Sequence, residues 1–269
     1  MNKYFHFLIF IAISCTSKVT EPPTEQILME KNNKMRSLGL IGGVSWHSTI
    51  DYYQSINQSV NEHYKNNTNP PLVVYTINQA DVHRFQKENK WDSIAYMLTS
   101  AALKLRSAGT EAVMFCANTP HKVFDQVQAQ LDFPVIHIGD ATAKEIKRKA
   151  IAKVGFIGTK YTMEDDFITK RLRQNGIEVL LPEDQVVTNE LQRIIEEELT
   201  YGTITTKSKQ YVMDVLQSMI DKGAEGLVLG CTEFPLMITQ DDFSIPVFNT
   251  TEIHSQAAVD FILTIENEN

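Results

Sequence analysis

The second half of this chain repeats the first. Residues 36–42 resemble residues 153–158, and the segment that starts at Gly109 resembles the one that starts at Gly223. Equivalent glycines in the two halves lie 114 to 116 residues apart. A repeat of this length, opening each time on a strand and a glycine turn, predicts two structural duplicates with a cleft between equivalent strand ends. The simpler alternative is that both halves only repeat a general alternation of strands and helices.

From residue 35 onward, short apolar runs alternate with amphipathic stretches. Continuous apolar strands separated by helices are typical of parallel sheets covered on both faces, so we expect an α/β fold. It would consist of two pseudo-symmetric αβα domains, residues 35–150 and 151–265, with mostly parallel sheets and the active site between them. The C-terminal helix could pack back on the first domain. Strands are expected at residues 38–41, 72–77, 112–116, 135–138, 154–157, 178–180, 226–229 and 247–248, and helices at 48–64, 91–108, 119–130, 141–150, 164–175, 187–199 and 206–222.

Charge and cysteine content exclude several classes of protein. The 269 residues include 25 Lys and Arg and 33 Asp and Glu, which gives a net charge of −8. No basic stripe is available to neutralise phosphates, which argues against nucleic acid as a partner. Three cysteines, Cys15, Cys116 and Cys231, are too few and too scattered for a disulfide framework or a cysteine-rich metal site.

Residues 1–34 have the pattern of a signal segment and linker. An apolar stretch at residues 4–13 is too short to span a bilayer but has the length of a signal-peptide core, and a polar run follows Cys15. This pattern predicts a bacterial lipoprotein signal in which Cys15 is lipidated and anchors the protein to the membrane of the cell envelope. The alternative is that translation starts at Met35, in which case the protein is cytoplasmic.

The internal repeat also indicates where chemistry could occur. At an offset of 114 residues, Cys231 falls opposite Ala117 and Cys116 falls opposite Gly230. Two thiols facing each other across a cleft could remove a proton from one face of a substrate α-carbon and return one to the other. Hydrogen-bond donors for the substrate carboxylate would come from the strand ends, close to helix starts. Suitable donors are Asn118, Thr119 and Thr232.

Several motifs closely resemble those of the aspartate/glutamate racemase family, over residues 36 to about 265. They are Gly-Leu-Ile-Gly-Gly-Val-Ser-Trp at 39–46, Ala-Asn-Thr-Pro-His-Lys-Val at 117–123, Gly-Thr-Lys-Tyr-Thr-Met at 158–163 and Leu-Gly-Cys-Thr-Glu at 229–233. The resemblance implies a two-domain α/β isomerase, commonly a homodimer, that racemises an acidic amino acid without pyridoxal phosphate or metal. It implies Cys231 and Thr232 as the second-half catalytic cysteine and its neighbour. It also implies substrate-binding positions at Val44, Gln86, Asn118, Thr119 and Thr162.

The first-half catalytic cysteine of the family directly precedes Asn-Thr, and here that position is Ala117. Cys116 could stand in for it only if the strand end bends, because successive side chains on a strand point to opposite faces. The alternative is that Cys116 is a small buried hydrophobic residue. Cys231 is expected next to a helix start, which would lower its pKa and favour the thiolate.

Other polar residues have weaker support. His121 could orient groups or shuttle protons, or it could be a capping or core histidine. Glu233 and His254 could support Cys231, or they could have surface or packing roles. Residues 81–88 are expected to form a loop over the mouth of the cleft. The candidate cations for a distal carboxylate of the substrate are Arg84, Lys122 and Lys160.

These observations predict a cofactor-independent amino-acid racemase that acts on aspartate, glutamate or a similar amino acid, with Cys231 exchanging the proton on one face. With Ala117 in the first-half position, turnover is expected to be asymmetric or slow. An alternative is a binding protein for acidic amino acids that keeps the cleft and has lost catalysis. A third is a related hydantoin- or maleate-type enzyme. The glycines at 39–43 lack the spacing of a dinucleotide-binding turn.

Overall fold

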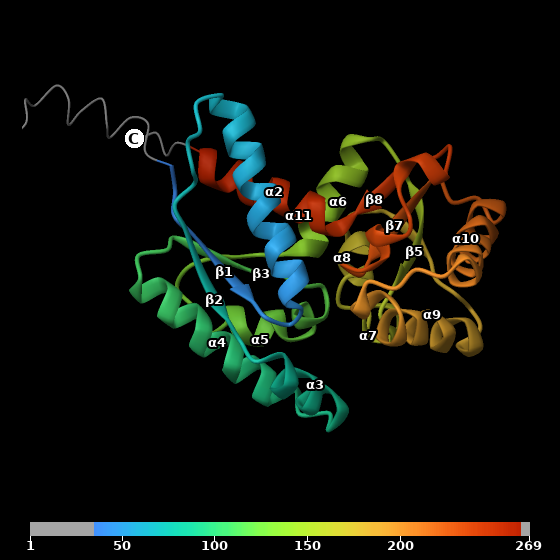
Figure 1. Ribbon diagram of the computed structural model, residues 1–269, viewed down its shortest axis with the longest axis horizontal. Coiled ribbons are helices and arrows are strands. Elements are labelled where there is room, and N and C mark those ends of the chain that lie inside the picture. The colour runs from blue at the N-terminus through green and yellow to red at the C-terminus, as the bar shows by residue number, and fades with distance from the viewer. Residues whose placement is uncertain (1–34, 265–269) are drawn as a thin grey trace, which may run out of the picture. The chain divides into compact units, whose positions relative to one another are not determined.

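The computed structural model describes residues 35–264 and contains two four-stranded parallel sheets of identical strand order (Figure 1). The first has the order β2-β1-β3-β4 and the second β6-β5-β7-β8. The repeat in the sequence is therefore a repeat of topology, and the predicted α/β class with parallel sheets is confirmed. The strands are β1 (Leu38–Gly42), β2 (Leu72–Thr76), β3 (Ala112–Phe115), β4 (Val135–Ile136), β5 (Lys153–Gly158), β6 (Glu178–Leu180), β7 (Gly226–Gly230) and β8 (Val247–Asn249).

Helices connect successive strands and cover the sheets. Those of the first half are α2 (Trp46–Tyr64), α3 (Gln79–Lys87), α4 (Trp91–Ser107), η1 (Thr119–Val123), α5 (Phe124–Gln128) and α6 (Ile138–Arg148). Those of the second half are α7 (Lys160–Glu164), α8 (Thr169–Gln174), α9 (Gln185–Glu197), η2 (Leu199–Tyr201), α10 (Thr206–Asp221), η3 (Phe234–Leu236), η4 (Gln240–Asp242) and α11 (Thr250–Leu263). Within residues 35–264, no helix is long and apolar enough to cross a membrane. The predicted signal segment and Cys15 lie outside the described residues.

Equivalent glutamates immediately precede one central strand of each sheet, β3 in the first and β7 in the second. The Glu111 carboxylate accepts a hydrogen bond from the Ser37 backbone N–H at 2.9 Å, just before β1. The Glu225 carboxylate accepts one from the Ala152 N–H at 2.8 Å, just before β5. The two glutamates are aligned by the internal repeat, so the repeat extends to the role of this side chain.

The last helix of each half packs into the core of the other half. Ile138 and Ile146 of α6 belong to the hydrophobic cluster that surrounds Phe156 of β5. Reciprocally, Ile262 of α11 belongs to the cluster around Leu40 of β1. Helix α11 lies against α2 and α6 (Figure 1). The boundary in packing therefore differs from the boundary in sequence at residue 150.

Three local expectations differ from the structure. The strand expected to reach residue 138 ends at Ile136, because His137 caps α6 by accepting a hydrogen bond from the Gly139 N–H at 2.9 Å. The helix expected at 119–130 starts as the 3₁₀ turn η1, with a proline at the start of the turn, before α5 begins. The helix expected at 164–175 is interrupted between α7 and α8, where Asp166 has a positive φ of 61°.

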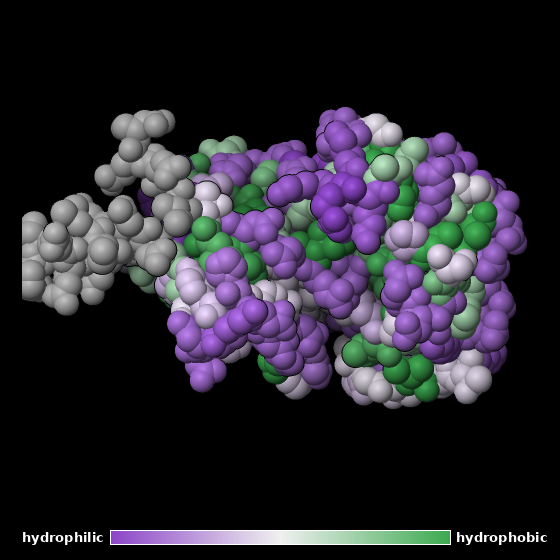
Figure 2. Space-filling view, turned by 90° about the horizontal axis from the view of Figure 1, so that it is seen from above, coloured by the Kyte–Doolittle hydropathy of each residue, from purple (hydrophilic) through white to green (hydrophobic). Residues whose placement is uncertain are grey.

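On the face drawn in Figure 2, hydrophilic residues lie between smaller hydrophobic areas.

Candidate active site

A cavity of about 580 Å³ lies where the central strands of both sheets end. In each sheet the strand order changes direction between the two central strands, which are β1 and β3 in the first sheet and β5 and β7 in the second. The strand that follows the first central strand is added on one side of the sheet, and the later strands are added on the other side. Ligands of open α/β sheets bind at the carboxyl ends of strands at such switch points. Another cavity of about 600 Å³ lies against β2, α3 and α4, and none of the predicted site residues line it. We therefore take the cavity between the strand ends as the active-site cavity.

Most residues predicted from the sequence line this cavity. They are Val44, Gln86, Ala117, Asn118, Thr119, Cys231, Thr232 and Glu233. Further lining residues that the sequence did not single out for binding are Ser45, Gln79, His83, Lys87, Thr159, Tyr161, Gln192, Ile195, Glu196, Thr200 and Tyr201. Both halves therefore contribute side chains to one site.

The turn after β1 requires glycine. Gly43 has a φ of 94°, and a Cβ on it would lie 2.1 Å from the Ile77 carbonyl oxygen. The Gly43 N–H donates a hydrogen bond to the Thr49 hydroxyl at 3.0 Å, and that hydroxyl donates to the Ser45 carbonyl at 2.9 Å. This tight turn brings Val44 and Ser45 to the wall of the cavity.

The equivalent turn after β5 corrects the expectation for Thr162. The Thr162 side chain is fully buried and donates a hydrogen bond to the Thr159 carbonyl at 2.8 Å. A Cβ on Gly158 would lie 2.2 Å from the Thr162 hydroxyl. Thr162 therefore holds the turn in place, and it is Thr159, the N-cap of α7, that lines the cavity.

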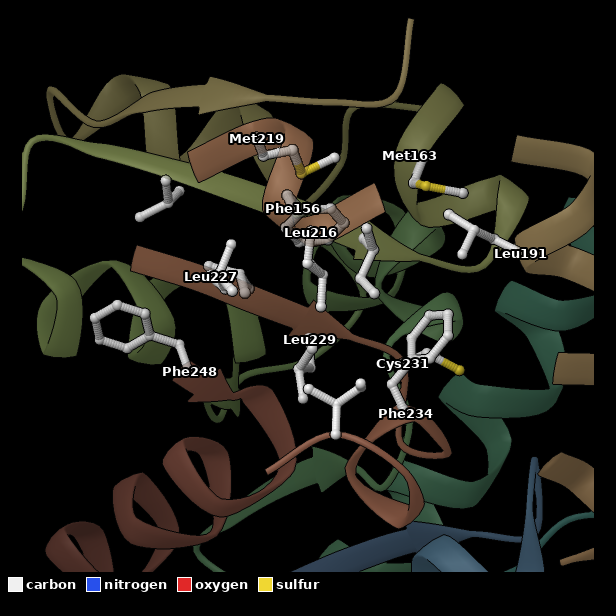
Figure 3. Packing of buried hydrophobic residues seen from close by; sticks show 14 of the residues in the cluster. Phe156, Met163, Leu191, Leu216, Met219, Leu227, Leu229, Cys231, Phe234 and Phe248 are labelled. Carbon is white, nitrogen blue, oxygen red and sulfur yellow. The ribbon is translucent and has the colours of Figure 1, made fainter. Parts of the chain in front are cut away.

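Cys231 lies at the end of β7 with its thiol next to a carboxylate. Its Sγ donates a hydrogen bond to Glu233 Oε2 at 2.8 Å, and the Thr232 hydroxyl donates to the same oxygen at 2.8 Å. Figure 3 shows Cys231 within a hydrophobic cluster, with its sulfur pointing away from Leu229. The expected support of Cys231 by Glu233 is therefore a direct contact.

The pKa of the Cys231 thiol is raised well above its ordinary value. The largest cause is burial, followed by the negative charge of Glu233 and the hydrogen bond to it. Hydrogen bonds from the backbone at Glu233 and Phe234 lower the pKa by less. This differs from the expected thiolate, because the amides of the following turn are outweighed by burial and by the neighbouring carboxylate.

Ala117 occupies the position in the first half that corresponds to Cys231, and it lines the cavity. Cys116 is 1% exposed and packs in the hydrophobic cluster with Leu40 and Tyr52. Burial raises the pKa of its thiol. The alternation of side chains along a strand explains this placement. The geometry therefore favours the core role for Cys116 over the catalytic one.

Asn118 and Thr119 connect the two halves at the cavity wall. The Asn118 amide donates a hydrogen bond to the Thr250 hydroxyl at 3.2 Å, and its Oδ1 is buried with no partner among the described residues. The hydroxyls of Thr119 and Thr159 lie 3.4 Å apart. An unpaired buried acceptor is costly, so Asn118 Oδ1 is a candidate to bind a ligand.

Neither of the two predicted histidines lines the cavity. His121 Nδ1 lies 3.0 Å from the Ala117 carbonyl oxygen, and its Nε2 accepts a hydrogen bond from the Ile138 N–H at 3.3 Å. His254 bonds the Tyr52 hydroxyl and the Ile136 carbonyl, both at 2.9 Å, rather than Cys231. Burial lowers the pKa of His254 to about 4 and, with His254 nearby, also lowers that of His121. Both histidines therefore fix the backbone around the site as neutral rings.

The cations proposed for a distal carboxylate are engaged elsewhere. Lys122 pairs with Asp165 at 2.8 Å and Arg84 with Asp81 at 2.8 Å. Lys160 lies 3.8 Å from Glu164. Instead, His83 and Lys87 line the cavity from α3, a helix that replaces the expected loop. A signal for this helix was present in the sequence, since Asn78 is an N-cap residue and accepts a hydrogen bond from the Ala80 N–H at 3.1 Å.

Comparisons with known proteins agree with this site. A family model described as Asp/Glu/Hydantoin racemase matches residues 41–258. A Yersinia pestis protein assigned as an Asp/Glu racemase is 41% identical over 86% of this chain and 100% of that chain, with a TM-score of 0.81. An aspartate racemase homologue from Pyrococcus horikoshii OT3 is 38% identical over 85% of this chain and 99% of that chain, with a TM-score of 0.74. The broad specificity amino-acid racemase RacX of Bacillus subtilis is 24% identical, over 86% of this chain and 100% of RacX.

Proposed function

Because the chain belongs to the Asp/Glu/hydantoin racemase family, we propose that it racemises aspartate, glutamate or a similar amino acid, with Cys231 exchanging the Cα proton on one face. The observation that carries this proposal is the contact between the Cys231 thiol and the Glu233 carboxylate at the wall of a cavity shared by both halves. A thiol needs a partner to take its proton before it can act as a base.

Glu233 is the group that would take this proton. If Cys231 lost its proton to solvent while Glu233 stayed ionised, two negative charges would stand 2.8 Å apart. Passing the proton from Sγ to Oε2 leaves only one negative charge in the pair. The thiolate so formed would abstract the Cα proton, and the electron pair of the broken C–H bond would stay on the substrate.

Polar groups around Cys231 offer partners for both ends of an amino acid. The Thr232 hydroxyl donates to Glu233, so its oxygen can accept a hydrogen bond from a substrate ammonium group, as can Asn118 Oδ1. The Thr119 hydroxyl can turn from Thr159, which lies 3.4 Å away, and donate to the substrate carboxylate. In this arrangement Asn118 and Thr232 serve as acceptors, which refines their expected role as donors.

The opposite face of the substrate has no equivalent thiol, because Ala117 lines that side of the cavity. Protonation there would come from solvent or from a polar neighbour. We therefore propose that the two directions of racemisation proceed at unequal rates.

The test is uptake of deuterium at Cα from D₂O, followed separately for each enantiomer of aspartate and of glutamate and without added pyridoxal phosphate. We expect uptake in the wild-type protein and in Cys116→Ser, and none in Cys231→Ser. If neither enantiomer of any acidic amino acid takes up deuterium, the racemase proposal for these substrates is wrong.

The second candidate function is binding of an acidic amino acid without turnover, and the alanine at position 117 favours it. Calorimetry would support this candidate if it detected tight binding of aspartate or glutamate under conditions in which Cα takes up no deuterium. Binding accompanied by exchange would exclude it.

We further propose that the protein forms homodimers and is anchored to the cell envelope through Cys15. Size determination in solution tests the first statement. Metabolic labelling with a fatty acid tests the second, because label should be present in the wild-type protein and absent from Cys15→Ala. A protein whose translation starts at Met35 would carry no label in either case.

A further inference from the structure

A second cavity adjoins the active-site cavity. Its volume is about 440 Å³, and it shares Thr200, Tyr201, Thr232 and Glu233 with the active-site cavity. On its other side it is lined by the first turns of α2 and by Leu236. We call it the side cavity. Its shared wall contains the residues that flank the catalytic thiol.

Glu233 lies in the wall between the two cavities. It lines both of them, and its Oε2 accepts the hydrogen bond from Cys231 at 2.8 Å. A proton on this carboxylate could therefore leave through the side cavity while a substrate fills the active-site cavity.

Two titratable side chains of α2 face this exit. His47 and Asp51 are four residues apart, so they lie on one face of the helix, and both are exposed and line the side cavity. Burial raises the pKa of Asp51, the charge of His47 lowers it, and the charge of Glu233 raises it. Asp51 therefore interacts electrostatically with both His47 and Glu233. Among the described residues, the titratable groups that line the side cavity are His47, Asp51, Tyr201 and Glu233.

We propose that His47 and Asp51 form a proton relay that connects Glu233, and through it the Cys231 thiol, to bulk solvent. The proposal rests on the proposed function of Cys231. In the proposed reaction Glu233 holds the former thiol proton while the Cys231 thiolate takes the Cα proton, so both groups then carry a proton. The O–H bond of Glu233 breaks, its proton forms a new bond to the Asp51 carboxylate or the His47 imidazole across the side cavity, and from there it passes to solvent. This returns the pair to its starting state, in which the Cys231 thiol donates a hydrogen bond to the ionised Glu233. Delivery of a proton to Cys231 follows the same steps in reverse.

The relay gives a physical role to the asymmetry of the site. A racemase with two thiols ends each turnover with the proton on the opposite sulfur. Here Ala117 has no exchangeable proton, so the pair of Cys231 and Glu233 must return to its starting protonation state by exchange with solvent. The side cavity offers a route for this exchange that does not require the substrate or product to leave first.

The first measurement follows the S–H stretching band of Cys231 in the infrared after rapid mixing with D₂O, with the active-site cavity filled by saturating 2-methylaspartate, which has no Cα proton, and with the band assigned by its loss in Cys231→Ser. We expect S–H to S–D exchange of Cys231 to slow by about tenfold or more in the double variant His47→Gln/Asp51→Asn. The band of Cys116, which lies in the core, is the internal reference and should not change. Glu62→Gln, an exposed carboxylate of the same helix, is the matched control and should exchange like the wild type. Equal Cys231 exchange in the wild type and the double variant would overturn the relay, whether or not the protein racemises any amino acid.

The second measurement uses turnover. With an amino acid that the wild type racemises, the double variant should show a kcat lower by about tenfold, an unchanged KM and partial rescue by added imidazole or formate. A rise in KM with an unchanged kcat would instead show that His47 and Asp51 bind substrate. If Cys231 exchange slows in the double variant while the wild type turns over no amino acid, the proposed function fails and the relay stands.

Discussion

Replacement of Glu233 by glutamine should make the Cys231 thiol more acidic and more reactive. Glutamine keeps the shape of the side chain and an oxygen that can accept the thiol hydrogen bond, but it removes the negative charge 2.8 Å from Sγ. Coulomb's law gives about 1.5 kcal/mol for the repulsion of two unit charges at this separation in bulk water, and about 6 kcal/mol at an effective dielectric constant of about 20. Because Glu233 is partly exposed, the lower figure is the safer basis for the prediction.

The expected effect is measurable as a rate of alkylation. About 1.4 kcal/mol corresponds to a factor of ten in an equilibrium constant, so the thiolate population of Glu233→Gln at neutral pH should rise by about tenfold or more. Only the thiolate reacts with iodoacetamide, so the alkylation rate of Cys231 should rise by the same factor. Because glutamine at position 233 cannot carry the displaced proton between Cys231 and solvent, we expect deuterium uptake at Cα to slow in this variant.

Two controls isolate this effect. Cys231→Ser measures alkylation of the remaining thiols, and Glu197→Gln removes an exposed carboxylate whose partner is Arg193. An alkylation rate in Glu233→Gln equal to or below that of the wild type would refute the reasoning, because it would show that the charge of Glu233 does not suppress ionisation of Cys231.

Two further predictions follow from the site and its surroundings. Ala117→Cys places a second thiol at the cavity wall and should bring the rates of the two directions of racemisation closer together, raising the slower one by about tenfold or more; unchanged rates in both directions would contradict the role given to this position. His254 has its pKa lowered to about 4 in the folded protein, against about 6.5 in the unfolded chain. Its ring is neutral in both states above this range, so as the pH falls from about 6.5 to 4 the unfolded state gains a proton that the folded state does not. The contribution of His254 to the free energy of unfolding should therefore drop by about 3 kcal/mol. Urea denaturation across this pH range measures the drop, and a flat profile would show that His254 is accessible to protons in the native state.

Much of the fold was predictable because buried parallel strands leave a direct trace in the sequence. All eight expected strands are present, since each is a short apolar run between polar turns. The internal repeat located the equivalent ends of β3 and β7, and with them Ala117 and Cys231. The offset between Cys116 and the cavity also follows from the alternation of side chains along a strand.

What the sequence did not predict depends on contacts between distant elements. Thr159 and Thr162 are both threonines at one turn, and only the direction of α7 decides that Thr159 faces the cavity. The positions of Lys87 and His83 depend on where α3 packs, and the protonation of Cys231 depends on how deeply β7 is buried. No local pattern of residues encodes these features.

Helix α6 packs in the core of the second half and α11 in the core of the first half, and this reciprocal packing has a consequence for the cooperativity of unfolding. A cut after residue 150 would leave the second fragment without Ile138 and Ile146 in its core and the first without Ile262. Neither fragment would hold a complete hydrophobic core, so neither should fold when expressed alone. For the same reason, unfolding of either half should remove a helix from the hydrophobic core of the other half. Calorimetry should therefore record one transition for the intact chain, whereas two independent domains would give two. We therefore expect the duplicated halves to unfold as a single thermodynamic unit.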